Sequence, residues 1–195
     1  MILWRRLDIP GHELADLRQA RHGWELAGTA LLGHAGRPCR LDYVIDCDPS
    51  WRTRSANVRA NIGGAERSLH VLCDETRAWT VNGEYVRAAS GCVDIDLGFS
   101  PSTNLLPIRR LRLAIGATAD VRAAWVRFPE LTLEVLDQKY IRQSATTYHY
   151  ESANGAFQRE LTVDADGFVT DYPGLWLAEA TSQSSNAKEG RRAAE

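Results

Sequence analysis

Two carboxylates separated by one residue, Asp94 and Asp96, are the pair in this sequence with the clearest capacity for chemistry. In a strand, side chains two residues apart point to the same face, where two carboxylates repel each other unless they are hydrated, bound to metal or paired with cations. Arg109, Arg110 and Arg112 could supply those cations. Three interpretations stay open: a salt-bridged corner joining a helix to the sheet, a polar cluster at a cavity mouth that hydrogen-bonds hydroxyl groups, and a metal or nucleotide-sugar D-x-D site that needs further ligands.

Aromatic residues form the second candidate group, since the chain contains six tryptophans. Indole rings stack against sugar rings or acyl chains, although most tryptophans in a domain belong to the core. We therefore predict an apolar wall with a polar rim beside it. The predicted ligand-binding residues are Asp94, Asp96, Asn104, Arg109 and Arg110 at the rim, and Trp51, Trp79, Trp125 and Tyr140 along the wall.

No residue is assigned a catalytic role, because the sequence has no nucleophile elbow, no H-E-x-x-H motif and no phosphate-binding loop. We expect no cofactor and no metal, and a protein that is not an enzyme. His70 and His149 fall in predicted strands, where a half-buried, hydrogen-bonded histidine is commoner than a catalytic base. The cysteines, which lack C-x-x-C spacing, are expected to be small buried side chains in a reducing compartment: Cys39, Cys47, Cys73 and Cys92.

The elements that position these residues are predominantly strands. Apolar residues alternate with polar ones through much of 24–163, most clearly in 37–48, which is typical of strands with one buried face. Asn82-Gly83 predicts a two-residue hairpin turn between strands 79–81 and 84–86. Short turns between successive strands imply an antiparallel meander, and long strands twist and curl. We predict a mainly β protein: a strongly curved antiparallel sheet forming an open or half β-barrel, with one or two short helices at its mouth.

Two further segments refine this prediction. In 51–63 one face carries small apolar residues such as Ala56, Val58 and Ala60, which would leave room inside the sheet. The run 140–150, in which neither face is cleanly apolar, is interpreted as one strand that faces a partly wet cavity. Helical spacing and a proline suited to a first turn predict a short helix at 104–112. We expect one domain over 1–178 and a disordered polar tail over 179–195.

Charge and hydropathy limit the class of partner. The net charge of -2 gives no positive field that would collect nucleic acid. The chain has no apolar run of the roughly 18 residues that a membrane helix requires, and its amino terminus has no apolar signal region. We expect a cytoplasmic protein without a nucleic-acid partner or a membrane span. An exposed edge strand would allow a homodimer.

Several segments together resemble a known family. In chain order they are Trp51-Arg-Thr-Arg-Ser-Ala56, the Trp79–Gly83 hairpin, Gly91-Cys-Val-Asp-Ile-Asp-Leu97, the stretch from Ser100 to Leu111, Ala124-Trp-Val-Arg-Phe-Pro129, Gln138-Lys-Tyr140 and Asp171-Tyr-Pro-Gly-Leu-Trp176. They closely resemble the bacterial putative glycolipid-binding domain family, formerly a domain of unknown function, over about residues 4–177. The resemblance implies a curved open sheet similar to the Lol-type lipoprotein carriers, which hold acyl chains in an apolar concavity.

We therefore expect a lipid- or glycolipid-binding protein without catalytic activity that holds an apolar ligand in the concavity of the sheet. Burial of an acyl chain would supply about 0.8 kcal/mol per methylene, and the polar rim would supply selectivity. Two alternatives remain. One is a hydrolase- or transferase-type enzyme that acts on a sugar-like substrate through Asp94 and Asp96. The other is a protein-interaction module whose sheet edge or concavity receives a peptide segment.

Overall fold

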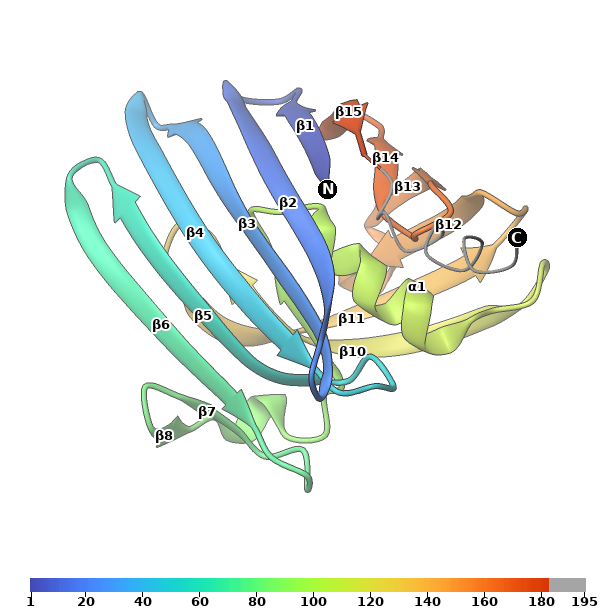
Figure 1. Cartoon of the computed structure of the whole chain (residues 1–195), viewed down its shortest axis with the longest axis horizontal. Coiled ribbons are helices and arrows are strands. Elements are labelled where there is room, and N and C mark those ends of the chain that lie inside the picture. Colours follow the sequence, from blue (N-terminus) through green and yellow to red (C-terminus); the bar gives the residue numbers. More distant parts are fainter. Residues whose placement is uncertain (183–195) are drawn as a thin grey trace, which may run out of the picture.

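The computed structural model describes residues 1–182, which form one large curved sheet and one short α-helix (Figure 1). The helix is α1 (Leu105–Leu111), and short 3-10 turns lie at Arg87–Ala89, Ser102–Asn104 and Ala153–Gly155. The strands are β1 (Ile2–Arg6), β2 (Gly11–Ala20), β3 (Gly23–His34), β4 (Arg37–Cys47), β5 (Thr53–Ile62), β6 (Ala65–Cys73), β7 (Trp79–Val81), β8 (Glu84–Tyr85), β9 (Asp94–Leu97), β10 (Thr118–Arg127), β11 (Thr132–Arg142), β12 (Thr147–Ser152), β13 (Phe157–Val163), β14 (Val169–Tyr172) and β15 (Trp176–Thr181).

The strand order confirms the predicted open antiparallel sheet. Strands β8 to β1 follow one another in reverse chain order, β1 pairs with β15, and β15 to β9 complete the sheet. Every neighbouring pair is antiparallel except β9 and β10, which are parallel. Strands β8 and β9 are the two edges and do not pair with each other, so the sheet curls without closing into a barrel.

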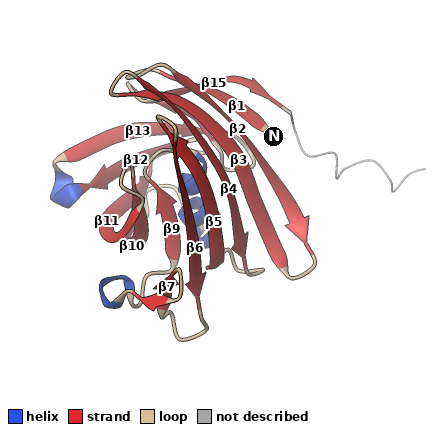
Figure 2. Cartoon of the chain, turned by 90° about the vertical axis from the view of Figure 1, so that its left-hand side faces the viewer, coloured by secondary structure: helices blue, strands red, loops and turns tan. Residues whose placement is uncertain are grey.

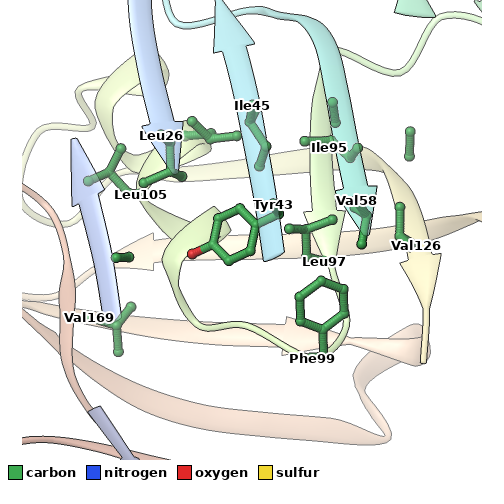
Figure 3. Close-up of a cluster of buried hydrophobic side chains, with 14 of the residues drawn as sticks. Leu26, Tyr43, Ile45, Val58, Ile95, Leu97, Phe99, Leu105, Val126 and Val169 are labelled. Carbon is green, nitrogen blue, oxygen red and sulfur yellow. The ribbon is translucent and has the colours of Figure 1, made fainter. Parts of the chain in front are cut away.

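The sheet overlaps itself. Its edge strand β9 and the neighbouring β10 lie against the concave face of β5. Ile95 and Leu97 of β9 and Val126 of β10 lie beside Val58 of β5 in the buried cluster drawn in Figure 3. A backbone hydrogen bond from the Thr53 N–H to the Val93 carbonyl oxygen joins the two ends at 3.2 Å. The small inner side chains of β5 do not leave open space, contrary to the prediction, because β9 and β10 pack against them.

Helix α1 crosses the concave side of the sheet, enclosed by strands in Figure 2 and spanning the opening between β2 and β11 in Figure 1. Its first turn is buried through Leu105, Leu106 and Ile108, whereas Arg109 and Arg110 in its last turn are partly exposed. It ends at Arg112, whose left-handed backbone (φ 45°) stops the helical hydrogen-bond pattern. The helix predicted at 104–112 is thus present, with its apolar side filling part of the interior.

Of two local predictions, one is confirmed and one is wrong. The Asn-Gly hairpin is confirmed, with positive φ at both Asn82 (51°) and Gly83 (88°). The single strand predicted over 140–150 is wrong, because β11 ends at Arg142 and β12 starts at Thr147. The Ser144 hydroxyl accepts hydrogen bonds from the N–H groups of Thr146 and Thr147, which gives this backbone an alternative to strand pairing.

The carboxy-terminal strand extends past the predicted domain boundary at 178. Residues Leu3 and Ile2 of β1 pair with Ala180 and Thr181 of β15, and this pairing satisfies backbone groups that the predicted tail would leave in water. The rest of the predicted tail, 183–195, lies outside the described residues. Within 1–182 no helix is long and apolar enough to cross a membrane.

Candidate functional site

The charge of Asp94 is neutralised by Arg110 of helix α1. It lies on the concave face of β9 with 1% of its surface exposed, and Arg110 donates from Nε and Nη2 to its two oxygens at 2.9 and 2.5 Å. Burial raises the pKa of the Asp94 carboxyl, and the guanidinium acts against this rise by favouring the ionised form. This geometry is the salt-bridged corner among the three sequence interpretations, and Asp94 is therefore a structural anchor of α1.

Asp96 lies two residues further along the same face but has no cationic partner among residues 1–182. The Gln138 amide donates from Nε2 to Oδ2 at 2.6 Å, and within residues 1–182 no second side chain donates to this carboxylate. Burial raises the pKa of Asp96 to about 6, and the neighbouring charge of Asp94 adds to the increase. Asp96 is partly exposed, so its free Oδ1 can accept a hydrogen bond from a ligand.

The side chains next to Asp96 combine hydroxyl groups with aromatic faces. Trp125, also partly exposed, is the register partner of Asp96 across β9 and β10. The Tyr140 hydroxyl donates to Asn104 Oδ1 at 2.9 Å, which ties the start of α1 to β11. The Tyr150 ring packs edge-on against Tyr140 and Tyr172 at centroid distances of 5.1 and 6.2 Å. A carboxylate flanked by aromatic rings and hydroxyl groups can bind polar, ring-shaped ligands through hydrogen bonds and stacking.

Sequence reasoning missed four members of this cluster: Gln138, Tyr150, Ser152 and Tyr172. Gln138 faces Ser152 across β11 and β12, and both are buried. The Tyr150 hydroxyl interacts with Ser152 and Gln138, and these contacts act against the burial that raises the pKa of Tyr150. Strand alternation places 138, 140, 150 and 152 on one face, but interpreting 140–150 as one strand hid the turn that brings 150 and 152 back beside 140 and 138.

The structure brings six of the nine predicted residues together and separates the other three. Asp94, Asp96, Asn104, Arg110, Trp125 and Tyr140 form the cluster described above. Arg109 turns away from it, with its guanidinium 5.0 Å from the Trp51 ring, and Trp51 in turn stacks on Trp24 at 4.4 Å. These aromatic and cationic side chains form a second cluster beside the turn that links β4 and β5.

Trp79 lies in neither cluster. It is fully buried in β7, and its indole Nε1 donates to the Cys92 carbonyl oxygen at 3.0 Å. Arg77 donates to the carbonyl oxygens of Thr53, Cys92 and Val93, so the same region joins β7, the segment before β9 and β5. We conclude that Trp79 fixes the overlap of the sheet.

The described residues contain no group of three or more histidine, cysteine, aspartate or glutamate side chains placed to hold a metal ion. All four cysteines are free and buried, as the lack of C-x-x-C spacing predicted. Burial raises the pKa of Cys47 to about 12 and that of Cys73 to about 11, so both thiols are protonated and inert at neutral pH.

A second buried carboxylate, Glu13 of β2, has no sequence signal. Its Oε1 accepts hydrogen bonds from the hydroxyls of Tyr43 (2.6 Å) and Ser100 (2.5 Å), and Ser102 bonds to both hydroxyls. Its Oε2 is buried without a partner within the described part of the chain. Burial raises the pKa of Glu13 from 4.5 to about 7. The network ties the segment before α1 to the opposite wall of the sheet.

We expect this carboxyl to make stability depend on pH. The raised pKa means that the folded state binds the proton more tightly, so the contribution of Glu13 is complete below pH 4.5 and is lost as pH rises through 7. Its full size is about 3 kcal/mol, from about 1.4 kcal/mol per pKa unit. The free energy of unfolding of Glu13→Gln, minus that of the wild type, should therefore rise by about 3 kcal/mol between mildly acidic and mildly alkaline pH.

Urea unfolding across that pH range measures this difference. Glu66→Gln, which changes an exposed carboxylate on β6, is the matched control and should give a flat difference. A flat difference for Glu13→Gln as well would show that Glu13 does not titrate with folding.

The fold and the cluster define a class: a β protein whose open curved sheet surrounds a short helix and presents carboxylate, amide and aromatic groups on its concave side. Residues 1–178 match the family described as putative glycolipid-binding, and the chain belongs to that family. The chain is also similar to a crystal structure of a DUF1089 family protein from Pseudomonas aeruginosa. The two are 36% identical with a TM-score of 0.76, covering 85% of this chain and 91% of the other. No curated protein matches this chain.

Proposed function

We propose that this protein binds a glycolipid or a similar amphiphile without transforming it, with the polar head at Asp96 and the apolar part on the concave face of the sheet. The description of the family, which names glycolipid binding, supports this class of ligand. The proposal depends on the difference between the partners of Asp94 and those of Asp96. Arg110 neutralises Asp94, whereas Asp96 keeps an oxygen available beside Trp125.

This arrangement suits a hydroxyl-bearing head group. A carboxylate oxygen accepts a hydroxyl proton, and a hydrogen bond to a charged group contributes about 1.5–3 kcal/mol. The partly exposed indole of Trp125 offers a face for the apolar side of a sugar ring. Gln138, buried behind Asp96, holds the carboxylate in place through its amide.

An acyl chain would pack along partly exposed apolar side chains on the same face. Leu136 precedes Gln138 by two residues, and Phe157 is the register partner of Ser152, so strand alternation aligns both with Trp125. Each buried methylene contributes about 0.8 kcal/mol. The space around α1 is filled by Leu26, Tyr43, Phe99 and Leu105. The ligand therefore approaches from the Trp125 side and leaves this packed region intact.

One observation favours a second candidate, an enzyme that acts on a sugar-like substrate. A carboxyl with a pKa of about 6 can serve as a general acid near neutral pH. Its neighbour Asp94 is committed to Arg110, so Asp96 would act without a second free carboxylate in this cluster. Turnover of an aryl glycoside that disappears in a folded Asp96→Asn variant would favour the enzyme over the binding protein.

Native mass spectrometry of freshly purified protein, followed by lipid extraction, tests the binding function directly. Titration with n-octyl β-D-glucoside, followed by calorimetry, gives the affinity. Asp96→Asn should weaken binding roughly 10- to 100-fold, the equivalent of one charged hydrogen bond. The matched control is Asp137→Asn, which removes an exposed carboxylate from β11 and should leave affinity unchanged. Absence of both co-purified lipid and glucoside binding would overturn the proposal.

A further inference from the structure

We infer that the Asp96 site selects a neutral, hydroxyl-rich head group and discriminates against an anionic one such as a phosphate. This inference rests on the proposed function and narrows its ligand class, since amphiphiles carry either kind of head. The observation behind it is the distribution of charge on the concave face: within the described residues, no cation that is free to meet a ligand lies beside Asp96.

The carboxylates come from three places in the chain. Asp94 and Asp96 lie on β9, and Glu13 lies on β2, all turned to the inner side of the sheet. Within residues 1–182, two of the arginines near them are paired with carboxylates, and a third, Arg109, lies over the Trp51 ring at 5.0 Å, away from Asp96. Arg110 bonds both oxygens of Asp94, and Arg6 donates from Nε and Nη2 to both oxygens of Asp8 at 2.7 and 3.1 Å. Neither guanidinium can turn to a phosphate without giving up its carboxylate.

The charge that a head group meets at this site is that of Asp96 itself, which no cation balances within residues 1–182. Asp94 is the charged group that acts on the pKa of Asp96, and it raises that pKa. An anionic head group placed beside Oδ1 would be repelled by the Asp96 carboxylate. A neutral hydroxyl avoids the repulsion and donates the proton that this oxygen lacks.

The rim has two further arginines to consider. Arg127 lies 5.9 Å from the Trp125 ring and faces Glu130 and Glu134 at 3.9 and 3.6 Å, so its charge is balanced locally. Arg159 lies over the Phe157 ring at 4.6 Å and donates to the carbonyl oxygens of Pro173 and Gln158. The charge of Arg159 acts against the burial that raises the pKa of Tyr172. Arg159 is therefore the rim cation that could bind a phosphate, next to Phe157. The test must include a phosphate amphiphile for this reason.

The uncharged groups of the site point to the same ligand. The hydroxyls of Tyr150 and Ser152 and the Gln138 amide lie together, and hydroxyl and amide groups each donate and accept hydrogen bonds. A polyol has the same dual character at every hydroxyl. A fully ionised phosphate, in contrast, only accepts, and proteins bind it with arginines, lysines or several converging N–H groups.

The test compares three amphiphiles with the same eight-carbon chain at one ionic strength: n-octyl β-D-glucoside, n-octyl phosphate and n-octyltrimethylammonium. Isothermal titration calorimetry should give the glucoside at least a roughly tenfold tighter Kd than the phosphate or the ammonium. Asp96→Asn should weaken glucoside binding and reduce its preference over phosphate, because the repelling charge is removed. Trp125→Ala should weaken binding of the glucoside but not of the other two amphiphiles. Because it leaves Asp96 unchanged, this variant also tests the site if Asp96→Asn does not fold.

The outcomes separate the two proposals. Phosphate binding as tight as glucoside binding would overturn the selectivity, and its loss in Arg159→Gln would locate an anion site at the rim. Tightest binding of the ammonium would also overturn it. Failure of the wild type to bind any of the three compounds would contradict the proposed function itself.

Discussion

Replacing Asp94 by asparagine should lower the free energy of unfolding by about 3 kcal/mol, because it leaves a guanidinium in the interior without its counter-charge. Removal of one partner from a buried ion pair costs about 3–5 kcal/mol. We expect the lower end, since the Arg110 side chain keeps 20% of its surface exposed and can recover some hydration. The effect should appear as a lower midpoint in urea unfolding at neutral pH.

The matched control for this prediction lies two residues away. Asp96→Asn removes a carboxylate from the same strand and face, but no cation loses its partner. Because its pKa is raised to about 6, removal of this charge should not destabilise the fold at neutral pH. A double variant, Asp94→Asn with Arg110→Gln, should recover part of the loss. Equal destabilisation by the two single variants would contradict the division of roles between Asp94 and Asp96.

Replacing Trp79 by alanine should cost about 3–5 kcal/mol, the range for deleting a fully buried tryptophan side chain. The indole is entirely enclosed, and its hydrogen bond to Cys92 joins β7 to the segment that leads into β9. The vacated volume lies where the sheet overlaps itself, so the loss should be accompanied by faster hydrogen exchange of backbone amides in β7 and β9. Urea unfolding and hydrogen exchange measure the two effects.

A second substitution separates the anchoring role of Trp79 from a role in ligand binding. Trp79→Phe keeps most of the volume but loses the indole donor, and we expect a loss of only about 0.5–1.5 kcal/mol, because the Cys92 carbonyl oxygen keeps its hydrogen bond from Arg77. Affinity for n-octyl β-D-glucoside should stay at the wild-type value in this variant. A loss of affinity in folded Trp79→Phe protein would return Trp79 to the predicted ligand wall.

Much of the local structure was predictable because its cause is local. The alternation in 37–48 corresponds to β4 (Arg37–Cys47), and the Asn82-Gly83 turn has the positive φ angles that the hairpin needs. The helix predicted at 104–112 is α1 (Leu105–Leu111). Each pattern depends on a backbone repeat or a turn preference that neighbouring residues specify.

The composition of the candidate site was only partly predictable. Arg109 and Arg110 are adjacent and chemically identical, but successive residues on a helix differ by about 100° in direction. Arg110 therefore reaches Asp94, while Arg109 reaches Trp51. The choice depends on how α1 is rotated within the sheet, which contacts with distant strands determine. The hydrogen bond from Gln138 to Asp96 spans 42 residues and has no signature in either segment.

The sequence by itself determined strands with clear alternation such as β4, the hairpin, the short helix and the placement of Asp94 and Asp96 on one face. Only the tertiary structure decided that β9 lies inside β5, that Ile95 and Leu97 are buried on the opposite face of β9, and that one of the two carboxylates remains unpaired. The physical reason is the sequence separation over which each kind of interaction acts. Alternation and turn chemistry act over a few residues, whereas the overlap of the sheet is set by packing between side chains that are far apart in the chain.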